Sequence, residues 1–340
     1  MKRIIFLTVL SFVVLTALQG QGQYQSKYPD IPIVDVHYQP TELSHVVNMV
    51  KVRDVIKQKY DSYLAYFICL NNVEDHDAMR KVTNNRILFS VHAGVTHLGN
   101  KNGGFDFTAE EVIEKVQNGF VGFKFWFGGP YRRLEPGQAG ITRLDDPRFA
   151  PLFAKLEKAN VLMTSLHNAD PNGPFGNRTS WMFDPVFYWE QIRALENVLA
   201  TYPKLTIVAA HGAWLVCQDA QFDYLRYMFS TYPNLYVDIS ATFQFMHLSN
   251  RDNIRDFYIE YQDRLLYGTD GGQVSEEGIN SYADRYAKTF AILETDQVVD
   301  GGFFGNTPTK GLDLPKEVLE KIYYKNAVKL YPGLKEIMGL

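Results

Sequence analysis

The sequence predicts an α/β fold, a single-domain (β/α)8 TIM barrel with extra C-terminal helices, and three observations predict it. Eight short apolar runs are rich in β-branched and aromatic residues, and helix-compatible segments separate most of them. Polar residues recur where these runs end. Strands that alternate with helices imply right-handed crossovers and a parallel sheet, and eight such units close naturally into a barrel. The 340 residues suffice to form this barrel as one domain.

The predicted elements follow one another in regular alternation. Strands are expected at residues 33–38, 62–70, 87–93, 119–125, 161–166, 205–210, 235–240 and 264–268. Helices are expected between them, at residues 42–59, 74–82, 108–118, 147–160, 185–202, 218–231 and 252–263. Two further helical patterns, at residues 275–293 and 315–331, follow the eighth strand and supply the extra C-terminal helices.

The N-terminus has the pattern of an export signal. Lys2 and Arg3 form a short positive region, residues 4–18 are mostly apolar, and Gly20-Gln21-Gly22 offers a small-x-small cleavage site. The apolar run is short for a membrane span, which needs about 20 residues, so an uncleaved anchor is the alternative interpretation. The pattern predicts a protein that is exported, and periplasmic or secreted after cleavage of the signal peptide.

The expected domain organisation and composition narrow the choice of partners. A signal peptide that is removed is expected at residues 1–22, a (β/α)8 barrel at residues 31–332, and a C-terminal tail at residues 333–340. The formal net charge is −4 and no basic tract stands out, which argues against nucleic acid as a partner. We expect a small-molecule substrate and no stable membrane span after processing, and a homo-oligomer is compatible with the sequence. Cys69 and Cys217 lie in apolar surroundings and are expected to be buried free thiols, with a disulfide as the alternative.

Ionisable and amide side chains recur at the carboxyl ends of the predicted strands. They are His37 and Gln39 on the first strand, His92 on the third, Lys124 on the fourth, His167 on the fifth, His211 on the sixth, Asp238 in the seventh and Asp270 after the eighth. Since barrel enzymes build their sites at this rim, the pattern predicts an active site there. Residues i and i+2 of a strand point the same way, so Asp35, His37 and Gln39 are expected to share one face.

Three of these residues suit a metal site. His37, His167 and Asp270 would provide two imidazoles and a carboxylate, a set suited to one divalent ion, Zn²⁺ first, with a position open for water. Such an ion lowers the pKa of bound water to about 7. Asp270 would ligate the ion, take the proton of its water, or both, and His211 would polarise a substrate carbonyl or support an oxyanion. Asp238 is a candidate for orienting a histidine.

The order of these motifs resembles a known family. The sequence has His37-Tyr38-Gln39, Leu166-His167-Asn168, Ala210-His211-Gly212 and Tyr267-Gly268-Thr269-Asp270 in turn. This arrangement resembles the amidohydrolase superfamily, in its amidohydrolase-related branch with the metal-dependent (β/α)8 hydrolases and the aminocarboxymuconate-semialdehyde decarboxylase type. The segments Gly119-Phe120-Val121-Gly122-Phe123-Lys124 and 324–331 also resemble motifs of that branch, and the resemblance spans about residues 31–332.

Gln39 departs from the family pattern, which has a second histidine at this position. An amide oxygen is neutral and binds Zn²⁺ less well than an imidazole does. Three interpretations follow. A mononuclear site would use His37, His167 and Asp270, with Gln39 as a weak ligand or water-holder. A metal-free barrel would use Asp270 as base with His211 or Lys124 as electrophilic helper, and a degenerate barrel would bind a ligand without turning it over.

Four residues are candidates for substrate binding, each with a structural alternative. They are Lys124, Arg132, His92 and Trp126. Lys124 and Arg132 would hold a substrate carboxylate, the arginine bidentately from a loop. The alternative for Lys124 is an ion pair with a core acid, and for Arg132 an ordinary place on the surface. The alternative for His92 is a structural role, and for Trp126 packing in the core. Specificity is expected in the loop after the fourth strand and in segments 168–182 and 301–314.

The resemblance implies a hydrolase that cleaves a C–O or C–N bond of a lactone, ester or amide, and the N-terminal pattern implies that this hydrolase is exported. The substrate is expected to be small and to carry a carboxylate, and the nucleophile to be a water activated by the metal or by Asp270. The alternative is a non-oxidative decarboxylase of an aromatic or enol acid, the other chemistry of this branch. A second alternative is a non-catalytic ligand-binding barrel with a degenerate metal site.

Overall fold

The computed structural model describes residues 24–94, 107–127, 143–172 and 185–340, and the elements follow in this order. The first half contains β1 (Pro32–Tyr38), α2 (Leu43–Tyr60), β2 (Tyr63–Cys69), α3 (His76–Val82), β3 (Ile87–Phe89), β4 (Val91–Gly94), α4 (Ala109–Gln117), β5 (Phe123–Trp126), η1 (Pro147–Phe149), α6 (Ala150–Lys158) and β6 (Met163–His167). The second half contains α7 (Pro185–Thr201), β7 (Ile207–Ala209), η2 (Ala210–Trp214), α8 (Asp219–Thr231), β8 (Leu235–Asp238), η3 (Phe243–Leu248), α9 (Arg251–Glu260), β9 (Leu265–Leu266), α10 (Ile279–Glu294), β10 (Val298–Asp300), β11 (Pro308–Lys310), α11 (Lys316–Glu320), η4 (Lys321–Lys325), α12 (Asn326–Leu330) and α13 (Leu334–Met338). The predicted alternation of strands and helices is confirmed.

The strands β1 to β9 are parallel and follow one another in chain order around the molecule. The pairing runs β1-β2-β3 and then β4-β5-β6-β7-β8-β9. At the far side β9 returns to β1, because the Val36 amide donates to the Tyr267 carbonyl over 3.0 Å and Tyr38 pairs with Gly271. This ring of parallel strands with its outer helices is the predicted α/β TIM-barrel fold.

The third predicted strand, residues 87–93, is divided at Ser90 into β3 and β4. β3 pairs with β2, whereas β4 pairs with β5. The Ser90 hydroxyl lies 3.1 Å from the Gly122 carbonyl and also contacts Thr164 Oγ1. A buried hydroxyl must find partners, and here it finds them across the barrel interior at the point where the strand is interrupted. The prediction of one continuous strand was therefore wrong at this residue.

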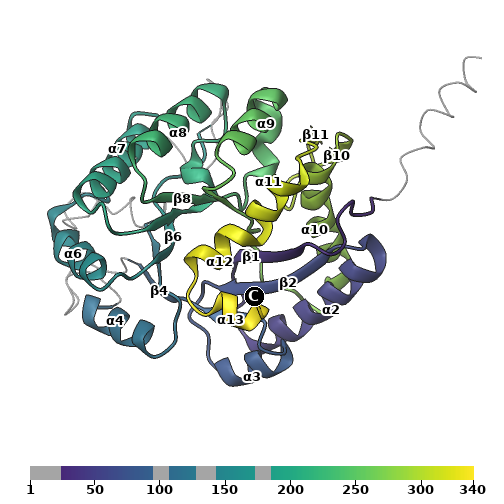
Figure 1. Ribbon diagram of the computed structural model, residues 1–340, viewed down its shortest axis with the longest axis horizontal. Helices are drawn as coiled ribbons and strands as arrows, with labels where there is room; N and C mark the ends of the chain where they lie inside the picture. Colours follow the sequence, from purple (N-terminus) through teal and green to yellow (C-terminus); the bar gives the residue numbers. More distant parts are fainter. Residues whose placement is uncertain (1–23, 95–106, 128–142, 173–184) are drawn as a thin grey trace, which may run out of the picture.

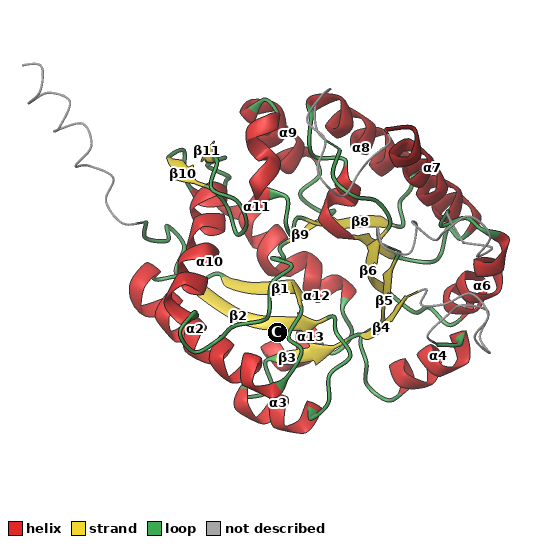
Figure 2. Ribbon diagram, turned by 180° about the vertical axis from the view of Figure 1, so that it is seen from behind, coloured by secondary structure: helices red, strands yellow, loops and turns green. Residues whose placement is uncertain are grey.

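The helices form the outer layer and the C-terminal segments cover one end of the barrel. Figures 1 and 2 show α2 to α4 and α6 to α10 around the strands, with α12 and α13 across one end. The Tyr331 hydroxyl donates to the Thr164 carbonyl at the start of β6, and the Asn326 amide donates to the Leu265 carbonyl at the start of β9. This end is thus the one where strands begin, and the carboxyl rim lies opposite. The segment 333–340, expected as a tail, contains α13.

Two apolar clusters fill the fold. The larger one lies mainly between the strands and the outer helices. The smaller one joins strand residues to the C-terminal helices; its members include Val34, Val36, Ile68, Val208, Leu266, Ala327, Tyr331 and Leu334. The barrel interior is therefore packed with apolar side chains where the strands begin, and the ionisable groups gather at the opposite rim. Cys69 and Cys217 are buried free thiols, as predicted.

Strand β1 is irregular between Asp35 and Tyr38, and this changes which side chains share a face. Asp35 accepts hydrogen bonds from the Thr269 hydroxyl and from the Tyr286 hydroxyl of α10, away from the rim. His37 and Gln39 do face the rim together. The expectation that Asp35 shares their face was wrong, because the irregularity breaks the alternation of side chains.

Two further findings concern the outside of the barrel. The antiparallel pair β10-β11, with Val298 opposite Lys310, follows α10 and was not predicted. Among the described residues, no helix has both the length and the apolar character needed to cross a membrane.

Candidate active site

His37 stands at the centre of the rim because both of its ring nitrogens have partners. Nδ1 lies 3.0 Å from Asp238 Oδ2 and 3.0 Å from Ser240 Oγ. Nε2 lies 3.0 Å from Lys124 Nζ and 3.1 Å from Asp270 Oδ1. His37 therefore links two groups of side chains, which we name the Ser240 cluster (Ser240, Asp238, His37, His211) and the Lys124 cluster (Lys124, Gln39, His37, Asp270).

The hydroxyl of Ser240 lies in the middle of the Ser240 cluster. It is 3.0 Å from His37 Nδ1 and 2.9 Å from His211 Nδ1, and it donates to Asp238 Oδ1. Asp238 Oδ1 also accepts from the backbone amides of His211 and Ser240. Asp238 thus orients His37 directly and holds the turn that carries His211, which confirms the predicted orienting role.

The turn after β7 explains how His211 reaches this cluster. His211 has φ 59°, and the left-handed conformation continues through Gly212 at φ 62° and Ala213 at φ 54°. Glycine adopts this conformation without strain, whereas the other two residues are held in it by their surroundings. The turn places the His211 ring against His37 as a stacked pair, with ring centroids 5.0 Å apart.

Asp238 and His211, two of the buried groups of the Ser240 cluster, have strongly shifted pKa values. Burial alone would raise the pKa of Asp238, but the charge of His37 and its hydrogen bonds outweigh burial and lower the pKa to about 2. Burial lowers the pKa of His211 to about 3. At neutral pH Asp238 is therefore an anion and His211 a neutral imidazole.

The Lys124 cluster contains the side chains that the sequence placed on the first, fourth and eighth strands. Lys124 is 3% exposed, and its ammonium donates to Gln39 Oε1 over 3.2 Å. The Gln39 amide donates to Asp270 Oδ1. Burial lowers the pKa of Lys124, against the charges of Asp270 and Asp238. Burial alone would raise the pKa of Asp270, but the positive charges that His211 and His37 carry when they are protonated outweigh burial and hold the pKa well below its usual range.

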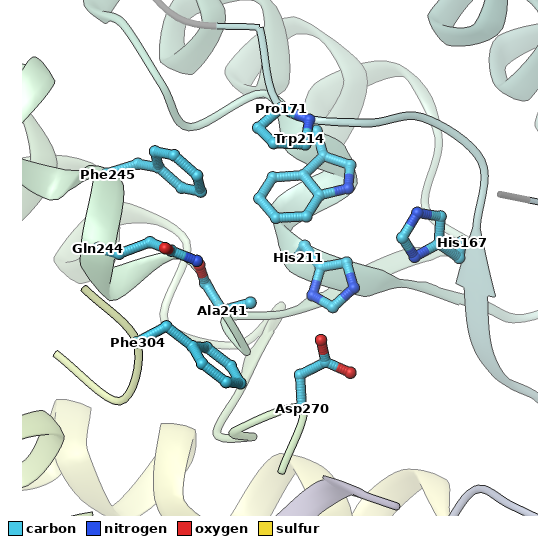
Figure 3. Close-up of a pocket in the computed structure, with 9 residues that line it drawn as sticks. All are labelled: His167, Pro171, His211, Trp214, Ala241, Gln244, Phe245, Asp270 and Phe304. Atoms are coloured by element: carbon cyan, nitrogen blue, oxygen red, sulfur yellow. The ribbon is translucent and has the colours of Figure 1, made fainter. Parts of the chain in front are cut away.

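A pocket of about 490 Å³ opens above these clusters. Among the described residues, its lining consists of His167, Pro171, His211, Trp214, Ala241, Gln244, Phe245, Asp270 and Phe304. Figure 3 shows the His211 ring and the Asp270 carboxylate facing one another, with Trp214, Phe245 and Phe304 around the space beside them. The pocket therefore has apolar, aromatic walls and a polar floor.

The other predicted residues lie at different distances from this pocket. His167 lines the pocket, and its ring stands edge-on to that of His211 with centroids 5.0 Å apart. His167 Nε2 lies 3.4 Å from Asp170 Oδ1. Trp126 is half-buried and packs edge-on against His167. His92 is half-buried beside Lys124 on the neighbouring strand, and burial lowers its pKa to about 3. Neither Trp126 nor His92 is among the described lining residues. Arg132 lies outside the described residues.

Ligand atoms of His37, His211 and Asp238 lie within 4.8 Å of one another, close enough for a group that holds a metal ion. Among the described residues, this is the group of histidine, cysteine and acidic side chains whose ligand atoms all lie within that distance. It differs from the predicted set of His37, His167 and Asp270. The Ser240 hydroxyl already lies between these atoms. The other ring nitrogen of His37, Nε2, lies 3.0 Å from the ammonium of Lys124. As the side chains stand, neither position fits a resident divalent ion.

Sequence reasoning missed several residues of the site. Ser240 follows Asp238 by two positions, the spacing that also links His37 to Gln39, so this signal was present in the sequence. Trp214 gave no signal, because it reaches the pocket through the left-handed turn after β7. Phe304 and Pro171 fall within the two segments where specificity was expected, residues 301–314 and 168–182.

The comparison with family models decides the relationship. A model described as Amidohydrolase matches residues 70–333, well over half of the chain. The chain belongs to the amidohydrolase family. This match confirms the resemblance expected from the sequence motifs. Members of this family are generally enzymes and typically depend on a metal. The matched segment begins after β2, so it includes neither His37 of β1 nor Gln39, which follows β1.

Solved structures resemble this amidohydrolase over most of its length. An uncharacterised TIM-barrel protein from Bordetella bronchiseptica has 16% identity and a TM-score of 0.50, with 91% of this chain and 100% of that chain covered. A Staphylococcus aureus protein described as an amidohydrolase has 15% identity and a TM-score of 0.50, with coverage of 88% and 99%. 2,6-Dihydroxybenzoate decarboxylase from Rhizobium has 13% identity and a TM-score of 0.47, with coverage of 88% and 98%. Among curated proteins, no sequence matches significantly. At these identities the similarity shows the fold alone.

Proposed function

We propose that this amidohydrolase hydrolyses a C–O or C–N bond in a small substrate with a planar ring, such as a lactone, an aryl ester or an amide. The observation that carries the proposal is the Asp270 carboxylate at the floor of an aromatic pocket. Its side chain is 28% exposed, whereas His37 behind it is fully buried. A carboxylate that is held ionised by buried partners and still reaches a pocket can bind and orient a water molecule.

His211 supplies a second acceptor for that water. Its Nδ1 lies 3.0 Å from the Ser240 carbonyl oxygen, which can only accept, so Nδ1 carries the proton. In the neutral ring Nε2 is then the unprotonated nitrogen. This tautomer favours proton acceptance by His211 over the polarising role that the sequence suggested. In the proposed reaction, the water oxygen bonds to the carbonyl carbon while one water proton passes to Asp270 or His211. The C–O or C–N bond to the leaving group then breaks, and the same proton passes to the leaving group.

Trp214 supplies a hydrogen-bond donor for the substrate. Its Nε1–H is buried and has no hydrogen-bond partner among the described residues. Such a donor is costly unless a ligand satisfies it. In Figure 3 the five-membered ring of Trp214 turns toward His167, at the edge of the pocket. We assign this N–H to a carbonyl or carboxylate oxygen of the substrate. Lys124 lies behind Gln39, and its predicted contact with a substrate carboxylate stays a prediction, as does that of Arg132.

An assay of Asp270→Asn tests the proposal. With a panel of lactones, aryl esters and aryl amides, the substitution is expected to lower kcat/KM for the active substrate by about 10²–10⁴-fold, because the amide accepts no proton. Asp256→Asn, at an exposed position on α9, is the matched control and should leave turnover unchanged. Circular dichroism checks that both variants fold. Full activity of Asp270→Asn would contradict the proposal.

Non-oxidative decarboxylation of an aromatic acid is the second candidate, and the walls formed by Trp214, Phe245 and Phe304 favour it as well. Carbon dioxide release from a panel of phenolic acids separates the two reactions. If phenolic acids are decarboxylated and every lactone, ester and amide is inert, the decarboxylase replaces the hydrolase.

We also propose export. The support is the N-terminal sequence, with Lys2 and Arg3, the apolar run of residues 4–18 and the cleavage pattern at Gly20-Gln21-Gly22. Residues 1–23 lie outside the described part of the chain, so the signal peptide stays a prediction. The predicted Zn²⁺ ion also stays a prediction, which the metal content of the purified protein tests.

A further inference from the structure

The Lys124 ammonium lies at the point on which the rim side chains converge. Nζ is 3.0 Å from His37 Nε2 and 3.2 Å from Gln39 Oε1. Asp270 lies beside this point and not in contact with the ammonium: its Oδ1 is 3.1 Å from the same His37 nitrogen and accepts from the Gln39 amide. An imidazole nitrogen, an amide oxygen and a carboxylate are groups that would otherwise surround a divalent cation.

The charges of the site agree with a cation at this position. Asp238 and Asp270 bring two carboxylates to the rim, one on either side of His37. Asp238 is buried, and a buried carboxylate needs a compensating charge. Lys124, which is 3% exposed, contacts His37 through the ring nitrogen opposite the one that Asp238 holds. A divalent ion bound to His37 Nε2 would have to occupy the space of the ammonium. The two cations therefore exclude one another.

Gln39 suits a lysine better than it suits a metal ion. Its amide oxygen accepts from the ammonium while its nitrogen donates to Asp270 Oδ1, so both ends of the amide are used. A histidine at this position would present one ring nitrogen to the centre and could not bridge the two groups in this way. The departure of Gln39 from the family pattern and the position of Lys124 are thus two parts of one arrangement.

We infer that the Lys124 ammonium takes the place of the catalytic metal ion in this chain, and that Gln39 is the residue that accommodates it. The inference rests on the proposed function only for the reaction that this charge serves. The residues themselves supply the positive charge beside Asp270, and the site keeps no resident divalent ion.

Metal stoichiometry tests the inference without any use of turnover. The wild type, Lys124→Met, Gln39→His and the double variant are incubated with Zn²⁺ in excess, desalted and analysed by inductively coupled plasma mass spectrometry. We expect well below one equivalent in the wild type and about one equivalent in the double variant, because the ammonium is gone and an imidazole is gained. Lys158→Ala, at an exposed position on α6, is the control for loss of a lysine and should resemble the wild type.

Thermal unfolding gives a second readout on the same proteins. Zn²⁺ should raise the melting temperature of the double variant and leave that of the wild type unchanged, since an ion stabilises only the fold that binds it. If Lys124→Met alone fails to fold, Gln39→His and the double variant still report. About one equivalent of Zn²⁺ in the desalted wild type, lost in His37→Ala, would overturn the inference. Failure of the substrate panel would overturn the proposed function and leave these metal readouts intact.

Discussion

Asp238 reaches no substrate in the site described above, yet it fixes both histidines of the Ser240 cluster. One oxygen contacts His37 Nδ1 and the other accepts from the backbone of His211. Lys124 contacts the other ring nitrogen of His37, Nε2, and Gln39 in turn accepts a hydrogen bond from Lys124. Hydrogen bonds between buried polar groups therefore set the orientation of the side chains at the rim, and these side chains do not act in isolation.

The depressed pKa of Asp238 predicts a specific loss of stability in acid. Its pKa falls from 3.8 to about 2 on folding, so the ionised carboxylate stabilises the fold above pH 4, and this contribution is lost as the pH falls toward 2. The difference corresponds to about 2 kcal/mol of unfolding free energy. Urea unfolding of the wild type and Asp238→Asn between pH 6 and pH 2.5 measures it.

We expect the gap in unfolding free energy between the two proteins to be constant above pH 5 and to shrink below pH 4. A gap that does not change with pH would show that Asp238 stabilises the fold by packing alone. Asp256→Asn again provides the exposed control.

Strand β5 carries Lys124 into the site, and the residue just before this strand allows it to lie against β6. A Cβ at Gly122 would be 2.3 Å from the Leu162 carbonyl oxygen and 2.7 Å from Thr164 Cγ2. Gly122 also has φ +153°. The glycine is therefore needed for the close approach of two neighbouring strands, two positions before Lys124.

Gly122→Ala is expected to destabilise the fold by about 1–3 kcal/mol, because the backbone of β5 or β6 must move. The same movement shifts Lys124, so activity on the substrate identified above should fall as well. Differential scanning calorimetry and the turnover assay measure the two effects. Gly278→Ala is the control, since its nearest neighbour would be the flexible Ser275 hydroxyl. Equal melting temperatures for both variants would contradict the close-approach argument.

The molecule as a whole has one packed end and one reactive end. The C-terminal helices close the end where strands begin, with Leu334 fully buried and the Tyr66 hydroxyl donating to the Ile337 carbonyl of α13. The opposite end carries the two clusters and the pocket. This separation lets the site hold a strained turn at His211, and a Trp214 Nε1 that has no partner in the described part of the chain, on a scaffold stabilised elsewhere.

Deletion of residues 333–340 should therefore lower stability more than it lowers intrinsic turnover. Loss of a buried side chain such as Leu334 costs about 2–5 kcal/mol, and a chain of this size responds with a drop in melting temperature of several degrees. Deletion of residues 339–340 alone removes exposed groups and is the control. A melting temperature unaffected by the longer deletion would show that α13 does not close the barrel.

The sequence by itself determined the order of the barrel strands and the residues at their ends. Periodicity and β-branched runs are local signals, and the carboxyl ends of parallel strands meet at one rim, so His37, Lys124, His211 and Asp270 could be placed together without coordinates. Tertiary structure decided what each side chain does there. The irregularity in β1 turns Asp35 away from the rim, and the left-handed turn after β7 brings Trp214 to the pocket. Ser240 and Lys124 contact the two ring nitrogens of His37. These contacts join residues far apart in the chain and depend on strand register and packing, which no local pattern encodes.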